Sequence, residues 1–275
     1  MGLIIDGKEI AQKLQSDLVS RFRSLGRVIR ICEIAFGQHE ESSIYSRTRK
    51  KIAASLGVQM NSMNIPDDAD QKYAEERINE LAESSYDALF LSMPVPHNIS
   101  ADRLISMIPY SKDMEGLGSE NMAMLMRGIN SVFPATAKAI AYIVEVLGVS
   151  KGSEICIINR SRIIGRPLAM ALINMDYTVT VCHSRTLDLK RISREADVVV
   201  TATGKAGFLT REYVTEKSTV IDASIVSDGG RITGDASPDL KDFVARITPV
   251  PGGVGPVTNV MAFTNLYELV SGKQL

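Results

Sequence analysis

The sequence predicts a two-domain α/β protein whose second half forms a parallel, doubly wound sheet. The chain has 275 residues, close to twice the usual length of one domain. Apolar runs of strand length alternate with segments of helical period along most of it. A bridge rich in Gly, Asn and Met, residues 116–128, interrupts this alternation. We therefore expect a first domain over residues 1–130, completed by 257–275, and a second over 136–256.

The first half has the sequence pattern of βαβ units, in which strands and helices alternate and the strands run parallel. The expected strands cover residues 28–36, 58–63 and 87–93, and the expected helices cover 41–56 and 69–81.

The second half begins with an expected helix over residues 136–147 and then repeats the alternation. Four strands joined by crossovers favour a Rossmann-like doubly wound sheet. These strands cover residues 154–159, 178–182, 197–203 and 218–224, and the intervening helices 164–175 and 187–195. A last helix, 257–270, follows the Gly- and Pro-rich segment 248–256, which cannot continue a regular element.

Composition and charge exclude several classes of protein. The formal net charge is −1, so the broad positive field of a dedicated nucleic-acid binder is not expected. Cys32, Cys156 and Cys182 are far apart and odd in number, which suggests neither a disulfide framework nor a zinc knuckle and fits a reducing cytoplasm. We expect no signal peptide and no membrane helix, because no apolar run approaches the length that either needs.

A nucleotide-binding turn is expected where the first strand of the second half ends. The segment "NRSRIIGRP" lies between a strand and a helix, the context of the G-x-G-x-x-G fingerprint. Asn159 replaces the first glycine of that motif, Ser161 replaces the second, and Gly165 is displaced by one residue. Because Asn tolerates a positive φ, the tight turn remains feasible. A helix start that binds no ligand is the alternative.

The next strand end indicates NADP in preference to NAD. A ribose-binding acid is usual about 20 residues after the fingerprint, but the segment here is "CHSRT". His183, Ser184 and Arg185, together with Arg160, offer a hydroxyl and two guanidinium groups that suit a phosphate dianion. The alternative is that these arginines are solvated surface charges.

Four segments in order carry a resemblance to one family: "EESSIYSRTRKK", "LFLSMPVP", "KDMEG" and "TPVPGGVGPVTNVM". The chain resembles the bifunctional methylenetetrahydrofolate dehydrogenase/methenyltetrahydrofolate cyclohydrolases over nearly its whole length. The resemblance implies an N-terminal α/β catalytic domain and a Rossmann-like NADP-binding domain. It also implies tetrahydrofolate derivatives as substrates and a homodimer. The charge balance and the lack of long apolar runs argue against a nucleic-acid or membrane partner.

The resemblance implies four residues in the catalytic pocket. Tyr45 matches the tyrosine that packs on the folate ring system, and Arg49 stands where the family has its catalytic lysine. Ser92 replaces the glutamine that contacts this lysine, and Glu115 replaces the aspartate that grips the pterin. Further substrate residues are expected at Leu91, Met93, Pro251, Gly252 and Gly253. Expected at the cofactor are Ile225 and the residues of the two turns described above, Asn159, Arg160, Ser161, Gly165, His183, Ser184 and Arg185.

These substitutions affect the two reactions differently. Hydride transfer depends mostly on positioning, which Arg49 can provide. Hydrolysis needs a group that takes a proton from water, and a guanidinium stays protonated, so we expect hydrolysis to be weak or differently supported. Glu115 could pair with Arg49, with Ser92 making room. Alternatively, Glu115 grips the pterin alone and Arg49 lies along the folate.

Three other functions stay open. The chain could be a dehydrogenase of another small substrate, since fold does not fix function. It could be a basic-helix RNA-binding module built on residues 47–51, or a catalytically silent folate or nucleotide binder. No group of His, Cys, Asp and Glu has metal-ligand spacing, so we expect no metal.

Overall fold

The structure, a computed structural model, describes residues 2–37, 40–129 and 132–273. The chain forms two compact units. The N-terminal unit consists of Lys13–Phe133 and the residues from Ala262 onward, and the central unit consists of Pro134–Met261 and the residues up to Gln12. Each unit contains a parallel sheet, so the predicted α/β class is confirmed.

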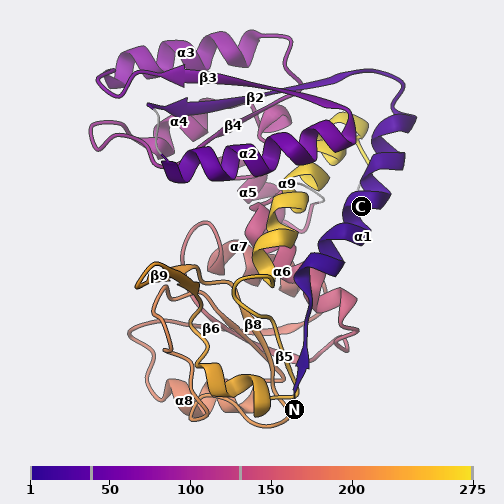
Figure 1. The fold of residues 1–275 in the computed structure, drawn as a ribbon, viewed down its shortest axis with the longest axis vertical. Coiled ribbons are helices and arrows are strands. Elements are labelled where there is room, and N and C mark those ends of the chain that lie inside the picture. Colours follow the sequence, from indigo (N-terminus) through magenta and orange to yellow (C-terminus); the bar gives the residue numbers. More distant parts are fainter. Residues whose placement is uncertain (1, 38–39, 130–131, 274–275) are drawn as a thin grey trace. The chain divides into compact units, whose positions relative to one another are not determined.

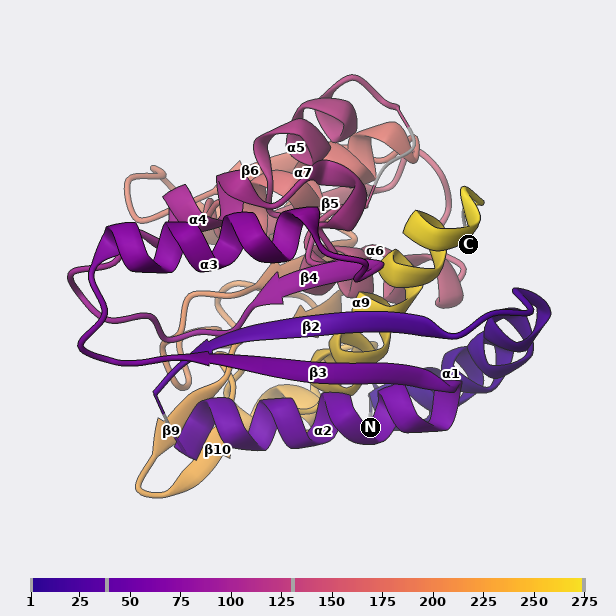
Figure 2. The ribbon, with the colours of Figure 1, turned by 90° about the horizontal axis from the view of Figure 1, so that it is seen from above.

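The N-terminal unit is a three-layer sandwich around the sheet β3-β2-β4. Its strands are β2 (Ile29–Phe36), β3 (Val58–Ile65) and β4 (Ala88–Leu91), all parallel. From the central β2, the chain crosses to β3 through α2 (Glu40–Leu56) and returns to β4 through α3 (Gln71–Glu83). Right-handed crossovers in opposite directions place α2 and α3 on opposite faces of the sheet, as Figure 2 shows.

The two faces of this sheet differ in polarity. Alternate β2 residues, Cys32, Ile34 and Phe36, are buried in an apolar cluster with residues of α3 and of α4 (Ala101–Met107). Residues between them, including Glu33, face the α2 side because strand side chains alternate. The α3 face is therefore the apolar core, and polar side chains enter on the α2 face.

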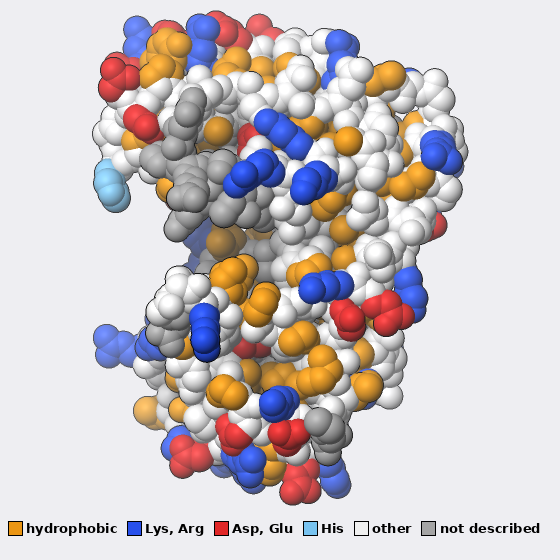
Figure 3. All heavy atoms as spheres, viewed as in Figure 1, with side chains coloured by type: hydrophobic (Ala, Val, Ile, Leu, Met, Phe, Trp, Pro, Cys, Tyr) orange, Lys and Arg blue, Asp and Glu red, His pale blue; other side chains and the backbone are white. Residues whose placement is uncertain are grey.

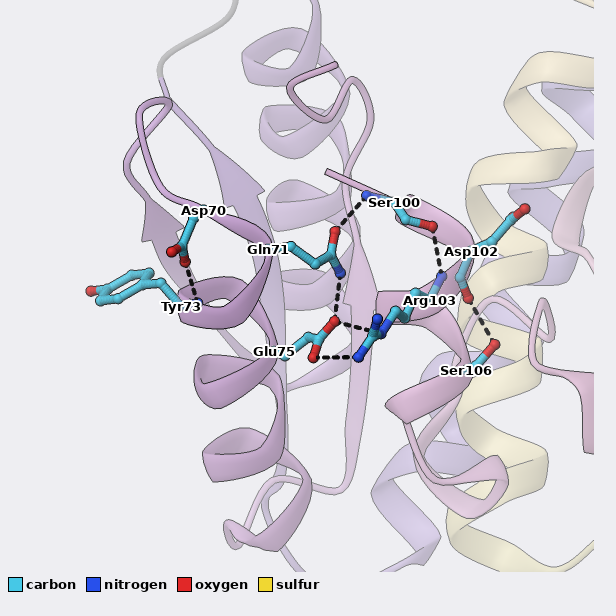
Figure 4. Close-up of polar contacts among 8 residues, drawn as sticks. All are labelled: Asp70, Gln71, Tyr73, Glu75, Ser100, Asp102, Arg103 and Ser106. Atoms are coloured by element: carbon cyan, nitrogen blue, oxygen red, sulfur yellow. Dashed lines mark hydrogen bonds and ion pairs between the residues drawn. The ribbon is translucent and has the colours of Figure 1, made fainter. Parts of the chain in front are cut away.

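A polar brace joins α3 to α4 at the surface of this unit (Figure 4). Gln71 accepts a hydrogen bond from the Ser100 backbone N–H at 2.7 Å and donates to Glu75 Oε1 at 2.8 Å. Glu75 also binds Arg103, with Nε to Oε1 at 2.6 Å. Exposed pairs of this kind contribute little stability, about 1 kcal/mol or less.

Among the described residues, four further helical segments contribute to the N-terminal unit. They are η1 (Tyr110–Lys112), α5 (Ser119–Met126) and parts of the long helices α1 (Gly7–Ser24) and α9 (Val254–Ser271). The rings of Phe22 in α1 and Tyr267 in α9 meet edge to face, 5.7 Å between centroids. The first and last long helices of the chain thus pack together.

The central unit contains a six-stranded sheet in the order β1-β11-β8-β7-β5-β6, with every pairing parallel. The strands that the sequence predicts are β5 (Glu154–Ile158), β6 (Thr178–Cys182), β7 (Val198–Thr201) and β8 (Thr219–Asp222), and the helices are α6 (Ala135–Val146), α7 (Gly165–Asn174) and α8 (Leu189–Glu195). In Figure 1 this unit is found by the labels β5, β6, β8 and α8. From β5 the chain moves outward to β6 through α7 and back to β7 through α8, so the two helices cover opposite faces. The predicted doubly wound sheet is confirmed.

Short elements extend this sheet beyond the expected four strands. The two-residue strands β1 (Leu3–Ile4) and β11 (Arg246–Ile247) pair with each other, and β11 pairs with β8. This pairing places Leu3 and Ile4 in the central unit. A hairpin of β9 (Val226–Asp228) and β10 (Arg231–Thr233), and the turn η2 (Pro238–Asp242), complete the unit. Within the described part of the chain, no helix is long and apolar enough to span a membrane.

Candidate active site

Helix α2 places Arg49 against the sheet. The residue is 1% exposed, and its guanidinium carbon lies 4.6 Å from the centre of the Phe90 ring on β4. Nη2 of Arg49 forms an ion pair with Oε1 of Glu115, whose side chain is 18% exposed. The buried charge is thus stacked on an aromatic face and paired with an acid, the two contacts that make a buried guanidinium tolerable. The predicted pairing of Arg49 with Glu115 is present.

Helical spacing separates Arg49 from its basic neighbours. Arg47, Lys50 and Lys51 are exposed, and Figure 3 shows Lys and Arg side chains gathered over α2. These three residues form a solvated face, and Arg49 points the other way, toward the sheet. Tyr45 lies in the same helix, but its side chain is outside the described part of the structure.

A rigid turn presents Glu115. The neighbouring Asp113 is 2% exposed and accepts hydrogen bonds from the backbone N–H of Gly116 (3.0 Å) and Gly118 (2.7 Å) and from Nδ2 of Asn121 (3.0 Å). Burial raises the pKa of the Asp113 carboxyl, against these hydrogen bonds. Gly116 has a φ of +66°, and a Cβ there would lie 2.5 Å from Phe133 Cα. Only glycine fits at this position.

Ser92 is held by a residue that the sequence analysis missed. Its hydroxyl donates to Oε1 of Glu33 at 2.7 Å, and Oε2 of the same carboxylate accepts from Ser46 at 2.6 Å and Ser62 at 2.9 Å. Glu33 is 2% exposed and lies at the middle of the central strand. The signal was present in the sequence, because a lone carboxylate interrupts the apolar run "IRICEIAF".

The neighbouring predicted substrate residues take different positions. Leu91 is buried in the apolar cluster on the α3 face, so its side chain points away from Ser92. Met93 is 59% exposed. The substrate roles of these two residues, and of Pro251, Gly252 and Gly253, stay predictions.

In the central unit, Asn159 shapes the turn after β5. Its Oδ1 accepts from the backbone N–H of Ser161 (2.7 Å) and of Gly165 (3.0 Å), and its Nδ2 donates to the Ala202 carbonyl (2.6 Å). The tight turn forms without a positive φ at Asn159. The Asn159 side chain therefore holds this turn through its three hydrogen bonds to the backbone.

Gly165 allows α7 to begin close to the end of β5. A Cβ there would lie 2.1 Å from the carbonyl oxygen of Asn159. No larger residue fits without moving the helix or the turn. The displaced glycine therefore keeps the close helix–strand approach that the third glycine of the fingerprint provides.

The predicted phosphate-binding residues lie at one edge of the sheet. Arg160 follows β5 and Arg185 follows β6, and the last residues of these strands, Ile158 and Cys182, are register partners. Arg160, Ser184 and Arg185 are exposed. Neither guanidinium is paired with an acid among the residues that the structure describes. Ligands bind at this carboxyl edge in open α/β sheets.

His183 is oriented by its own loop. Its Nδ1 accepts from the backbone N–H of Arg185 at 3.1 Å, and its backbone N–H donates to Thr186 Oγ1 at 2.8 Å. An accepting Nδ1 leaves the proton of the neutral ring on Nε2. The loop that carries Ser184 and Arg185 is thus tied at both ends.

Two aspartates fix the loops at the ends of β7 and β8. Asp235 accepts from Thr201 Oγ1 at 2.5 Å and from the N–H groups of Thr203 and Lys205, which lower its pKa against the opposing effect of burial. Asp222 is 1% exposed, and burial raises its pKa to about 6. Ile225, just beyond β8, is 72% exposed. Its predicted cofactor contact stays a prediction.

The segment "PGGVGP" packs tightly within the central unit. A Cβ on Gly253 would lie 2.6 Å from the Pro249 carbonyl oxygen, and a Cβ on Gly7 would lie 1.8 Å from the Gly253 carbonyl oxygen. Gly252 has a φ of +110°. Packing and backbone conformation therefore require Gly252 and Gly253, whatever the loop binds. No group of three or more acids, cysteines and histidines within the described residues could hold a metal ion.

Comparison with known proteins gives matches to both halves of the chain. Residues 5–115 match the tetrahydrofolate dehydrogenase/cyclohydrolase catalytic domain, and residues 134–274 match the NAD(P)-binding domain of the same family. The bifunctional protein FolD of Clostridium novyi is 34% identical over 275 residues, 98% of this chain and 99% of that protein.

Solved structures agree with this match over the full length. The bifunctional dehydrogenase/cyclohydrolase of Thermoplasma acidophilum superposes with a TM-score of 0.94 at 34% identity and covers 98% of both chains. The FolD enzyme of Campylobacter jejuni gives a TM-score of 0.94 at 28% identity and covers 99% of both.

Proposed function

The chain belongs to the tetrahydrofolate dehydrogenase/cyclohydrolase family, and on that premise we propose that it oxidises 5,10-methylenetetrahydrofolate with NADP and hydrolyses the methenyl product more slowly. The observation that carries the reaction class is the full-length similarity to bifunctional enzymes. The observation that carries the slow second step is the buried arginine at position 49.

The carboxyl edge of the central sheet suits NADP. Gly165 leaves backbone space at the start of α7, and Arg160, Ser184 and Arg185 offer exposed donors to a phosphate group. When bound, the nicotinamide supplies the hydride acceptor. A family relative uses NADP and a more distant neighbour uses NAD, as the Trypanosoma brucei and Saccharomyces cerevisiae proteins illustrate. The two arginines are our reason for proposing NADP here.

Arg49 and Glu115 suit the first reaction because it needs positioning more than proton transfer. The nitrogens of the folate stabilise the cation that forms when the hydride leaves, so the protein chiefly holds donor and acceptor in contact. The ion pair of Arg49 with Glu115 is electrically neutral as a unit. It can therefore line a pocket for a cationic product without adding net positive charge.

Hydrolysis places a different demand on this pocket. Water that attacks the methenyl carbon must lose a proton, and positioned proton acceptors typically contribute about 10²- to 10⁴-fold to such steps. The guanidinium of Arg49 stays protonated and its charge is committed to Glu115. The second reaction therefore runs more slowly than the first, or is absent in a dehydrogenase-only enzyme.

One time-resolved assay tests the proposal. Purified protein is mixed with methylenetetrahydrofolate and NADP, and NADPH and methenyltetrahydrofolate are recorded separately. We expect NADPH to form while the methenyl intermediate accumulates. Absence of NADPH formation would show a silent binder or a dehydrogenase of another substrate. Hydrolysis as fast as NADPH formation would refute the slow second step.

We also propose a homodimer, as the resemblance implies. Strand β6 is the last strand of its sheet, and its Val181 is 37% exposed, which is the kind of edge that proteins usually cover or protect. Light scattering on the purified protein measures its mass in solution, and a monomeric mass at micromolar concentration would contradict this proposal.

A further inference from the structure

A buried carboxylate lies in the catalytic unit at a position that packing alone does not favour. Glu33 is 2% exposed on the central strand β2, between β3 and β4. An apolar side chain would serve the interior of a sheet better, because burying a carboxylate carries a desolvation cost of several kcal/mol. Three hydroxyl groups offset this cost, from Ser46, Ser62 and Ser92. The carboxylate is an acceptor in all three hydrogen bonds, the role of its ionised form.

The two carboxylate oxygens have different partners. Oε2 accepts from Ser46 on α2 and Ser62 on β3, while Oε1 accepts from Ser92 alone. A serine hydroxyl has one proton and two lone pairs. Since Ser92 gives its proton to Glu33, its oxygen can still accept a hydrogen bond from a further group.

Glu33 and Ser92 share the α2 face of the sheet with the Arg49 ion pair. Glu33 is the register partner of Phe90, the residue on which the Arg49 guanidinium stacks, and Ser92 lies two residues beyond Phe90 on the same face. Ser46 lies one helical turn before Arg49. The carboxylate is therefore next to the residues that the family resemblance assigns to the folate.

We propose that Glu33, acting through the Ser92 hydroxyl, is the proton acceptor for hydrolysis of the methenyl group in this chain. The proposal rests on the proposed function. It explains how hydrolysis proceeds, more slowly than dehydrogenation, although position 49 cannot take up a proton, since the carboxylate is reached only through the Ser92 hydroxyl. It also assigns a role to Ser92, which is too short to act as the glutamine that it replaces.

The proton balance of this step is simple. The water oxygen forms a bond to the methenyl carbon, and one water proton passes to Ser92 Oγ as the Ser92 proton passes to Glu33 Oε1. The positively charged substrate becomes a neutral carbinolamine, and the carboxylate becomes a carboxylic acid. The carbon–N5 bond then breaks with the hydroxyl proton lost and N5 protonated, giving the 10-formyl product. Glu33 finally releases its proton to solvent, so one proton is released per turnover.

Glu33→Gln tests the proposal with little change in shape. The amide keeps an oxygen for Ser92 but cannot take up the proton. We expect the ratio of the hydrolysis rate to the dehydrogenation rate to fall about 10²-fold or more, the low end of what proton-transfer groups contribute. Ser92→Ala removes the connecting oxygen and should lower the ratio similarly. Glu33→Asp keeps a carboxylate and should give a ratio between those of the wild type and of Glu33→Gln.

Matched controls come from the surface brace in the same unit. Glu75→Gln makes the same chemical change where the carboxylate binds Arg103, and Ser106→Ala removes a hydroxyl that donates to the Asp102 carbonyl. Both are drawn in Figure 4. We expect the rate ratio of each to stay within about twofold of the wild type, since neither group takes part in proton transfer.

Several results would overturn the proposal. A purely structural role for Glu33 would lower both activities in parallel and leave their ratio unchanged. An unchanged ratio in Ser92→Ala has the same meaning, and this variant decides alone if Glu33→Gln does not fold. Wild-type protein that reduces NADP but hydrolyses methenyltetrahydrofolate no faster than buffer would refute the proton path and leave the dehydrogenase function intact. Wild-type protein that does not reduce NADP would instead refute the proposed function.

Discussion

Replacing Arg49 by lysine changes the proton chemistry of the pocket more than its charge. The substitution keeps a cation that can pair with Glu115, but it replaces a guanidinium that stays protonated by an amine that can release and take up a proton. We therefore expect Arg49→Lys to accelerate hydrolysis of methenyltetrahydrofolate.

The structure indicates how much Arg49→Lys should accelerate hydrolysis and how much stability it should lose. Proton transfer by a positioned group contributes about 10²- to 10⁴-fold, and we expect a gain near tenfold because the lysine meets Ser92 and not a glutamine. The variant loses the stacking of the guanidinium on Phe90, a desolvated cation–π contact of about 2 kcal/mol. The ion pair partner, Glu115, remains. The free energy of unfolding should thus fall by about 1 to 2 kcal/mol.

Two measurements on the same preparation check this prediction. Loss of the methenyl chromophore measures hydrolysis, and NADPH formation measures dehydrogenation, which we expect to change less than about threefold because it depends on positioning. Urea unfolding measures the stability cost. Hydrolysis that does not rise while dehydrogenation persists would refute the view that position 49 limits the second reaction through its proton chemistry.

Three further predictions concern the central unit. Arg185→Ala should raise the KM for NADP about tenfold and leave the KM for NAD nearly unchanged, because one charge-assisted contact contributes about 1.5 to 3 kcal/mol. Equal increases in the two KM values would contradict a phosphate-binding role for Arg185. Burial raises the pKa of Asp222 to about 6 from 3.8, so the folded state binds this proton more tightly. The free energy of unfolding should therefore rise as the pH falls from about 7 to 4, by at most about 3 kcal/mol from this residue. Asp235, whose pKa is lowered, loses its stabilising contribution only at lower pH. Urea titrations should show a flatter pH dependence in Asp222→Asn, and an equal slope would contradict the assignment. Gly165→Ala should lower stability by about 1 to 3 kcal/mol, because the added Cβ meets the Asn159 carbonyl oxygen at 2.1 Å; an unchanged melting temperature would show that the turn relaxes.

The long elements could be predicted from the sequence because their signals are local. The predicted strand over residues 28–36 matches β2 (Ile29–Phe36), and the predicted helix over 164–175 matches α7 (Gly165–Asn174). Apolar period and turn residues determine such elements. The two-residue strands β1 and β11 have no local signal, since they exist only because each pairs with a distant segment. For the same reason, the sequence does not indicate that the chain begins in the central unit.

Some features of the candidate site could be predicted from the sequence, and others could not. The ion pair of Arg49 with Glu115 is one of the two arrangements that charge and side-chain length left open, once the resemblance placed both in one pocket. The role of Asn159 could not be predicted from the sequence. An Asn whose side chain accepts two backbone N–H groups looks the same in sequence as an Asn whose backbone has a positive φ. Glu33 lies within an expected strand, and its three serine partners come from α2, from β3 and from the position directly after β4. Only the register of the sheet and the phase of α2 bring them together.

The unusual residues of the catalytic unit, Arg49, Glu115 and Ser92, depend on one another. A buried guanidinium at position 49 needs an acid within reach, and Glu115 supplies it; its side chain is one methylene longer than the aspartate that the resemblance implies there. The hydroxyl of Ser92 is held by Glu33, the register partner of the Phe90 on which Arg49 stacks. Each residue depends on the presence of another, so the effects of single substitutions toward the family pattern should not add. Restoring lysine alone brings back a proton carrier without the glutamine that accompanies it in the family, which is why hydrolysis in that variant should rise only part of the way.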